Sequence, residues 1–194
     1  MADPFEHRPG IGGRFEGRPL SGAGLRFLLV SEIRLLVLDV DGVLTPGDLM
    51  YGPGGEEIKR FYVLDGSAIR RWREAGYHAA IISGRSSTAV SRRAADLGVS
   101  FVRQGVADKV EPFLEACKVL GASPDATAVV GDDLLDIPMM RRCAVPIAVA
   151  NAVPAVKRLA RFVTRRAGGD GAVLEAVERL MRLNRNGLRA SGDR

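Results

Sequence analysis

A chain of 194 residues, 46% of them hydrophobic, is long enough for one globular domain with a substantial core. Its formal charge of +5 comes from basic residues that are spread along the chain, and only 6% of residues are aromatic. These features favour a surface that attracts anions in general. They do not indicate a specific nucleic-acid interface, which needs clustered basic residues and a platform for base stacking, and leave nonspecific binding as a distant third hypothesis.

The sequence also argues against membrane insertion and secretion. Charged residues such as Arg26, Glu32 and Asp39 interrupt the longest apolar stretch, residues 25–43, so we expect no membrane-spanning helix. We expect no signal peptide, because the charged start, apolar segment and cleavage site are not seen. Cys117 and Cys143 fall in predicted helices with no close spacing, which predicts a reduced, cytoplasmic protein.

Composition divides the chain into three parts. Residues 1–24 hold three prolines and six glycines with little apolar surface, which predicts a flexible N-terminal tail. We predict one folded domain over residues 25–184. The polar residues 185–194 are predicted to be a flexible C-terminal tail.

Within the domain, short apolar strands alternate with helices of about ten residues. We predict strands at 33–40, 79–82, 99–102, 126–130 and 147–150, and helices at 67–75, 87–97, 109–120, 139–143, from 154 onward and at 173–183. Glycine-rich turns bound a small hairpin, residues 49–51 and 58–63. The pattern predicts an α/β fold, a Rossmann-like three-layer sandwich with a mainly parallel sheet of five or six strands and a β-hairpin flap.

The first predicted strand ends in two carboxylates, Asp39 and Asp41. Side chains alternate along a strand, so both acids leave its end on roughly the same side. At about 4 Å two like charges repel by roughly 4 kcal/mol at an effective dielectric near 20, and a divalent cation or a shared proton relieves this cost. Two solvated acids in a turn would explain the pair if it stood alone.

Three later strands bring polar groups to the same edge of the sheet. In open parallel sheets the ligand crevice lies beyond the carboxyl ends of the strands. Ser83 follows the second strand, Lys109 follows the loop after the third, and an acidic group follows the fourth: Asp132, Asp133 and Asp136. Singly, each has an ordinary explanation as a turn residue, a surface lysine or an acid near a helix start. Together they predict one polar pocket.

The residue types in this pocket suit a phosphate ester. Mg²⁺ prefers carboxylates, waters and phosphate oxygens, whereas the chain has only His7 and His78 for a zinc site or a histidine triad. One aspartate of the first pair could attack phosphorus and the other could protonate the leaving group. Lys109 and the cation would neutralise the phosphoryl oxygens.

Four ordered segments, residues 39–45, 82–85, Lys109 and 131–136, resemble the four motifs of the haloacid dehalogenase superfamily of phosphatases. Residues 104–109 and 163–173 look like the small branch typified by 3-deoxy-D-manno-octulosonate 8-phosphate (KDO 8-phosphate) phosphatases. Related members act on nine-carbon sugar-acid phosphates or form the C-terminal domain of acylneuraminate cytidylyltransferases. The resemblance implies a Mg²⁺-dependent phosphomonoesterase that forms an aspartyl-phosphate intermediate and acts on a phosphorylated sugar acid.

The resemblance also implies a role for each residue. Asp39 would be the nucleophile and a metal ligand, Asp41 would be the acid/base and would bind the metal through its backbone carbonyl, and Asp132 would be the third protein ligand. Five residues would bind phosphate or substrate: Gly42, Ser83, Gly84, Arg85 and Lys109. Asp133 and Asp136 would support the metal site.

The chain is too short between its first two motifs for a domain that would cover the site. Only 41 residues separate Asp41 from Ser83, and the hairpin and one helix use nearly all of them, so no cap domain fits. An uncapped site stays wet unless something else closes it. The resemblance implies a homotetramer in which hairpins and C-terminal tails of neighbours complete the pocket, with residues 168–171 and 184–194 as candidates.

The chain departs from the sugar-acid phosphatases at two positions. Leu64 stands where a basic residue is expected, and Ala68 stands where a glycine is expected. Three arginines could replace the missing cation: Arg60, Arg70 and Arg85. The alternative function is a non-catalytic binding or assembly protein that keeps this fold and serves nucleotide-sugar synthesis.

Overall fold

The computed structural model describes residues 32–192, built around a six-stranded, wholly parallel sheet in the order β5-β4-β1-β6-β7-β8. Its strands are β1 (Leu35–Leu38), β4 (His78–Ile82), β5 (Phe101–Arg103), β6 (Thr127–Gly131), β7 (Val145–Ala148) and β8 (Phe162–Val163). The predicted N-terminal tail lies outside the described residues. The predicted fold class is confirmed.

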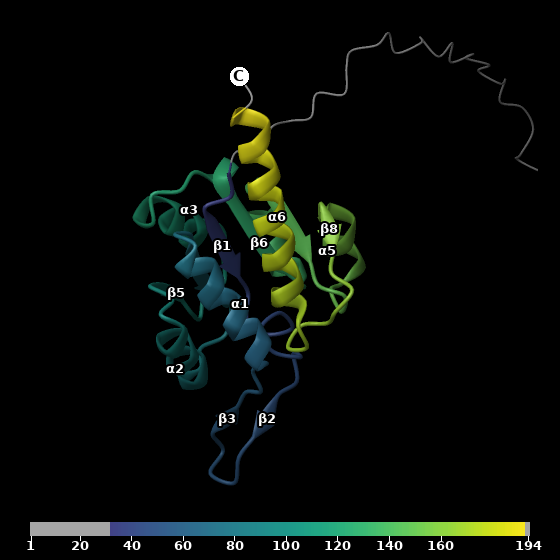
Figure 1. Cartoon of the computed structure of the whole chain (residues 1–194). Helices are drawn as coiled ribbons and strands as arrows, with labels where there is room; N and C mark the ends of the chain where they lie inside the picture. The colour runs from purple at the N-terminus through teal and green to yellow at the C-terminus, as the bar shows by residue number, and fades with distance from the viewer. Residues whose placement is uncertain (1–31, 193–194) are drawn as a thin grey trace, which may run out of the picture.

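Helices connect successive strands. They are α1 (Val63–Glu74), α2 (Thr88–Leu97), α3 (Val110–Val119), α4 (Ile137–Met140), α5 (Pro154–Leu159) and α6 (Ala172–Gly192), with short 3₁₀ turns at Pro124–Ala126 and Leu134–Asp136. Figure 1 shows α1 and α6 running side by side across one face of the sheet. By the right-handed crossover rule for parallel strands, α3, α4 and α5 lie on the other face, which gives three layers.

The core lies on both faces of the central strands. All four residues of β1 are buried, as expected for a strand with parallel neighbours on both sides and helices above and below. Trp72 on α1 and Phe113 on α3 fill opposite sides of this sheet with fully buried rings. Burial of these large side chains fixes β1, and therefore the acids at its end, in the middle of the molecule.

Helix α1 begins four residues before the predicted start at Ser67. The Asp65 carboxylate accepts hydrogen bonds from the backbone N–H groups of Gly171 (3.2 Å) and Leu174 (2.8 Å), at the start of α6. This contact holds Asp65 and Gly66 in the first turn of α1, although both precede the helix start predicted at Ser67. Tertiary contacts thus override local propensity here.

Helix α6 continues past its predicted end at Leu183 and ends at Gly192. Residues 185–192 are therefore helical, where the sequence predicts a flexible tail, and the last two residues lie outside the described part. Asn184 explains the extension, because its side chain is buried and bonds both the N–H and the C=O of Ile33 at 2.9 Å. The helix is thus anchored beside the start of β1.

The hairpin consists of β2 (Met50–Tyr51) and β3 (Glu57–Ile58), which are shorter than predicted. It projects beyond the sheet at the end where β1 finishes (Figure 1). The described residues include no separate cap domain, as the short spacing predicts. Within this part of the chain no helix is both long and apolar enough to cross a bilayer.

Candidate active site

Strand register brings three of the predicted residues to one level. Leu38 of β1 pairs with Ile81 of β4 and with Val130 of β6. Each strand therefore carries a polar residue within two positions of this level: Asp39, Ser83 and Asp132. The next two strands in the chain, β4 and β5, lie on one side of β1, and β6, β7 and β8 lie on the other. Ligands of α/β sheets bind at such a change in strand order.

A pocket of about 180 Å³ lies at this edge. It is lined by residues Asp39, Asp41, Ser83, Gly84, Arg85, Lys109, Asp132, Asp133 and Leu135. All but Leu135 were predicted from the sequence. Of the other predicted residues, Asp136 is fully buried behind the pocket, and Gly42 lies against Asp132.

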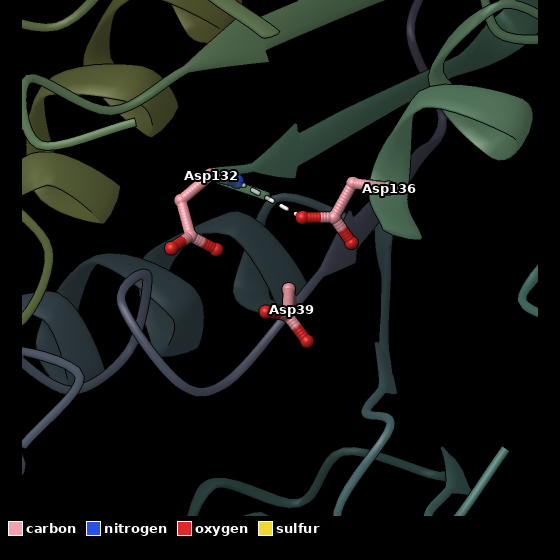
Figure 2. A group of neighbouring side chains, drawn as sticks. All are labelled: Asp39, Asp132 and Asp136. Carbon is pink, nitrogen blue, oxygen red and sulfur yellow. Dashed lines mark hydrogen bonds between the residues drawn. The ribbon is translucent and has the colours of Figure 1, made fainter. Parts of the chain in front are cut away.

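Three carboxylates from two loops form an acid cluster, defined as Asp39, Asp132 and Asp136. One oxygen of each lies within 4.8 Å of the others (Figure 2). Asp136 Oδ2 accepts hydrogen bonds from the backbone N–H groups of Asp132 (2.9 Å) and Asp133 (3.2 Å), so this oxygen supports the loop. In contrast, Asp132 Oδ1 is buried without a hydrogen-bond partner among the described residues.

Lys109 is the cation of the acid cluster. Its Nζ donates to Asp39 Oδ1 and Asp136 Oδ1, both at 2.7 Å, and its side chain is 3% exposed. Burial disfavours the ammonium form, but the two carboxylates outweigh this effect and raise the pKa of Lys109. Lys109 stands immediately before α3, at the position predicted for a phosphate-binding lysine.

One lysine does not balance three acids. Burial, followed by the charge of Asp136, raises the pKa of Asp39 to about 6 although Lys109 acts in the opposite direction. Burial, followed by the charges of Asp39 and Asp136, raises the pKa of Asp132 to about 8. For both acids, burial and the neighbouring carboxylates therefore outweigh the positive charge of Lys109.

The acid cluster fits a hard divalent cation. Its donors are carboxylate oxygens, with no histidine or cysteine among them, and Asp132 Oδ1 is an unused ligand atom. Gly42, with φ of +90°, lets the loop after β1 pass beside Asp132, since a Cβ there would collide with the Asp132 carboxylate. Such a cation would supply the charge that Lys109 alone does not.

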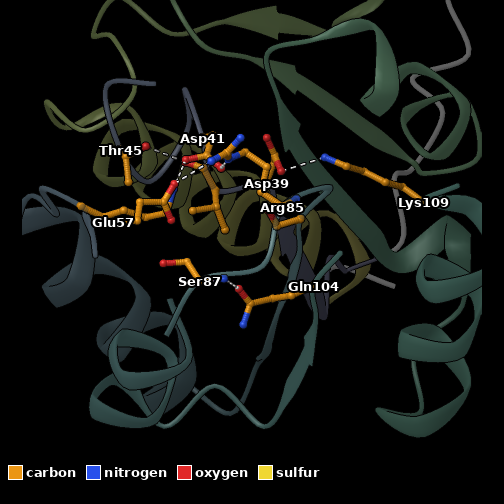
Figure 3. Close-up of polar contacts among 11 residues, drawn as sticks. Asp39, Asp41, Thr45, Glu57, Arg85, Ser87, Gln104 and Lys109 are labelled. Atoms are coloured by element: carbon orange, nitrogen blue, oxygen red, sulfur yellow. Dashed lines mark hydrogen bonds and ion pairs between the residues drawn. The ribbon is translucent and has the colours of Figure 1, made fainter. Parts of the chain in front are cut away.

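Asp41 belongs to a separate ion network, defined as Asp41, Lys59, Glu57 and Arg85. Lys59 Nζ is ion-paired with Asp41 Oδ1 and, at 3.3 Å, with Glu57 Oε1. Arg85 Nη2 donates to Glu57 Oε1 at 2.9 Å, and this partner raises the pKa of Arg85. Figure 3 shows Glu57, Arg85 and Asp41 on one side of Asp39, while Lys109 reaches Asp39 from the other.

A backbone clamp, defined as Asn151, Gly168 and Gly169, holds the loop after β1. Asn151 Nδ2 donates to Gly42 O at 2.9 Å, and Asn151 Oδ1 accepts from Gly168 N–H at 2.7 Å. Gly169 N–H donates to Val43 O at 3.0 Å. A Cβ on Gly168 would collide with the Gly42 carbonyl. These two glycines, which the sequence offers for closure of a neighbour's pocket, thus pack against the loop of their own chain.

Comparisons with known proteins bear on the family of this chain. Residues 56–144 match the haloacid dehalogenase-like hydrolase family. The chain is 44% identical over 150 residues to 3-deoxy-D-manno-octulosonate 8-phosphate phosphatase KdsC of Escherichia coli K12, covering 77% of this chain and 80% of the relative. The chain belongs to the haloacid dehalogenase-like hydrolases. Within this family, the named relatives place it among the phosphatases.

Solved structures of phosphatases resemble this hydrolase over most of its length. KDO 8-phosphate phosphatase of Moraxella catarrhalis, in complex with a magnesium ion, a phosphate ion and KDO, has a TM-score of 0.78 and 35% identity, covering 85% of this chain and 95% of the other. The cobalt-bound phosphatase of Haemophilus influenzae has a TM-score of 0.77 and 36% identity, covering 80% and 91%.

The three arginines that could replace the basic residue missing at position 64 have different surroundings in this hydrolase. Arg60 pairs with Asp170 at 3.1 Å, and Arg70 donates to the Asp96 carbonyl at 2.9 Å. Only Arg85 lines the pocket. Leu64 itself is 45% exposed, and Ala68 is fully buried within α1.

Sequence reasoning missed several residues that this hydrolase places at the site. Asn151 follows β7, so the rule used for the other strand ends could have found it. Leu135 lies between two recognised acids but carries no polar group. Glu57 and Lys59 give no signal, since charged residues in a short hairpin are normally on its solvated face.

Proposed function

We propose that this chain is a Mg²⁺-dependent phosphomonoesterase that forms an aspartyl-phosphate on Asp39 and acts on a phosphorylated sugar acid, KDO 8-phosphate or a nine-carbon analogue. The observation that carries the proposal is the acid cluster with its unpaired Asp132 oxygen, in one pocket with Lys109 and Ser83. The printed names of the relatives support the substrate class.

Asp39 is the nucleophile of the proposed reaction. Its carboxylate attacks phosphorus, and the bond to the substrate oxygen breaks. Lys109 holds Asp39 in the ionised, attacking form and lies at the edge of the pocket where phosphoryl oxygens would sit. Ser83, whose Oγ accepts from Arg85 N–H at 3.2 Å, can turn its own hydroxyl proton toward a phosphoryl oxygen.

Asp41 is the proton carrier. It donates a proton to the departing alkoxide and then takes one from the water that hydrolyses the aspartyl-phosphate. Its side chain is 20% exposed and lines the pocket, within reach of a substrate oxygen. Mg²⁺ held by Asp39, Asp132 and the Asp41 carbonyl would supply positive charge for the phosphoryl oxygens.

Arg85 is the proposed partner of the substrate carboxylate. It is the pocket arginine that remains after Arg60 and Arg70 are assigned to other contacts, and its side chain is 48% exposed. Leu64 supplies no charge at the position where a relative would carry a base. We therefore expect substrate preference to depend on Arg85.

Assembly and location stay proposals. The hairpin carries exposed apolar side chains, Leu49, Met50, Tyr51 and Ile58, which are suited to burial against neighbouring copies in a homotetramer. Sedimentation velocity measures the assembly directly. Cys117 and Cys143 are free thiols, which is consistent with the predicted cytoplasmic location.

The test is phosphate release in the presence of Mg²⁺ from a panel of KDO 8-phosphate, nine-carbon sugar-acid phosphates and neutral sugar phosphates. Asp39→Asn should lower the rate at least about 1,000-fold, because an amide is a poor nucleophile. An unchanged rate in this variant would remove Asp39 from the mechanism. Failure of the wild type on the whole panel, with Mg²⁺ still bound, would favour the non-catalytic alternative.

A further inference from the structure

Lys59 is a buried lysine outside the predicted motifs. It follows β3, and its side chain is only 2% exposed although Ile58 and Arg60 on either side are exposed. A lysine that loses its water so completely needs anionic partners. Lys59 finds them in Asp41 and Glu57. The hairpin thus sends one charged side chain inward, toward the pocket.

The two oxygens of Asp41 have different surroundings. Oδ1 is paired with Lys59 Nζ, whereas Oδ2 lies 3.9 Å from Arg85 Nε and is therefore held loosely. Glu57 holds both cations in place, because its Oε1 contacts Lys59 and Arg85 (Figure 3). The side chain of Asp41, which lines the pocket, is thereby fixed through one oxygen, and its other oxygen has no close partner among these cations.

Resting on the proposed role of Asp41, we propose that Lys59 is a positioning residue that orients the Asp41 carboxylate for proton transfer to the leaving group. Asp41 lies in a turn beyond β1, where a side chain can adopt several rotamers. An ion pair from the hairpin selects one of them and places Oδ2 for reaction. Proximity and orientation of this kind contribute several powers of ten to enzymatic rates.

Two substrates with different leaving groups test this role. An alkoxide, as from KDO 8-phosphate, needs a proton as it departs, whereas nitrophenolate, from p-nitrophenyl phosphate, does not. In Lys59→Met, single-turnover release of the alcohol should fall about 10- to 100-fold, and release of nitrophenolate should fall less than about 3-fold. The control is Lys118→Met, which removes an exposed lysine on α3 and should change neither rate.

The pattern of losses decides the outcome. Equal losses on both substrates would mean that Lys59 serves phosphate binding or the fold, and no loss would mean that Asp41 needs no orientation; either result overturns the proposal. Retained turnover of p-nitrophenyl phosphate shows that Lys59→Met is folded.

A double-mutant cycle gives a second test. If Lys59 acts through Asp41, Lys59→Met should slow Asp41→Asn by less than about 2-fold. A further tenfold loss would overturn the proposal. The double variant removes Lys59 and its partner carboxylate together, so Asp41 is not left without its cation.

Failure of this inference is distinguishable from failure of the proposed function. If Asp39→Asn and Asp41→Asn are strongly slowed and Lys59→Met has the wild-type rate, only the role of Lys59 is lost. If Asp39→Asn is fully active, the proposed phosphatase mechanism itself is wrong.

Discussion

The acid cluster and the ion network use the same residue types in one pocket but differ in charge balance. The acid cluster holds three carboxylates against the single ammonium of Lys109. The ion network matches two carboxylates with two cations, Lys59 and Arg85. Surplus negative charge is relieved by a bound cation or by protonation, whereas a neutral network fixes a side chain. The difference accounts for Asp39 and Asp41, two residues apart, in two separate roles.

The largest expected effect comes from removing one negative charge from the acid cluster. Asp132→Asn should lower phosphatase activity about 1,000-fold, because the cation loses a ligand and its charge stabilisation is worth several kcal/mol. Metal-free Asp132→Asn should nevertheless melt higher than the metal-free wild type at pH 9, since an uncompensated buried charge is gone. Calorimetric titration with Mg²⁺ and thermal melts measure both effects. Unchanged Mg²⁺ affinity would contradict the assignment.

Removing Lys109 would increase the excess of negative charge in the acid cluster. Lys109→Met leaves Asp39 and Asp136 without their cation and should lower the free energy of unfolding of the metal-free protein by about 3 kcal/mol. Urea denaturation measures the loss. Lys118→Met, which removes an exposed lysine, should change stability by less than about 0.5 kcal/mol. Equal small losses in the two variants would show that Lys109 does not neutralise the acid cluster.

The third prediction concerns pH. The pKa values of Asp39, about 6, and Asp132, about 8, lie above the ordinary value of 3.8. Folding therefore binds protons in this range, so the contribution of these two acids to the stability of the metal-free protein should be largest below their ordinary pKa and be lost as pH rises through about 6 and then about 8. The melting temperature should fall by several degrees between pH 5 and pH 9, and saturating Mg²⁺ should remove this fall. A flat pH profile without metal would contradict the charge imbalance.

The smallest expected effect comes from replacing Arg85, the most exposed member of the ion network. Arg85→Gln should leave stability within about 0.5 kcal/mol, because the guanidinium is largely solvated. The KM for a sugar-acid phosphate should rise up to about 10-fold, the size of one exposed charged contact. The KM for a neutral sugar phosphate should change little. Equal changes on both substrates would show that Arg85 contacts phosphate and not a carboxylate.

The sequence predicted the residues that follow the central strands because strand register does most of the positioning. Asp39, Ser83 and Asp132 reach one level through parallel pairing alone, and the apolar pattern of each strand is visible without a structure. The start of α1 was wrong because Asp65 and Gly66 are held by α6, more than 100 residues later. No local pattern records a contact as distant as the one that holds Asp65. Lys59 was missed because a charged residue in a short hairpin normally lies on its solvated face, and Asn151 was missed although it follows β7 as the other site residues follow their strands.

The clamp has a consequence for how the site is made. Asp39, Asp41, Lys109 and Asp132 have all been synthesised long before Gly168 and Gly169, which close on the loop after β1. A nascent chain stopped at residue 160 would carry every proposed reacting group but none of the glycine contacts that shape this loop. We therefore expect activity to be acquired late in synthesis, when the final segment folds back and seals the first motif.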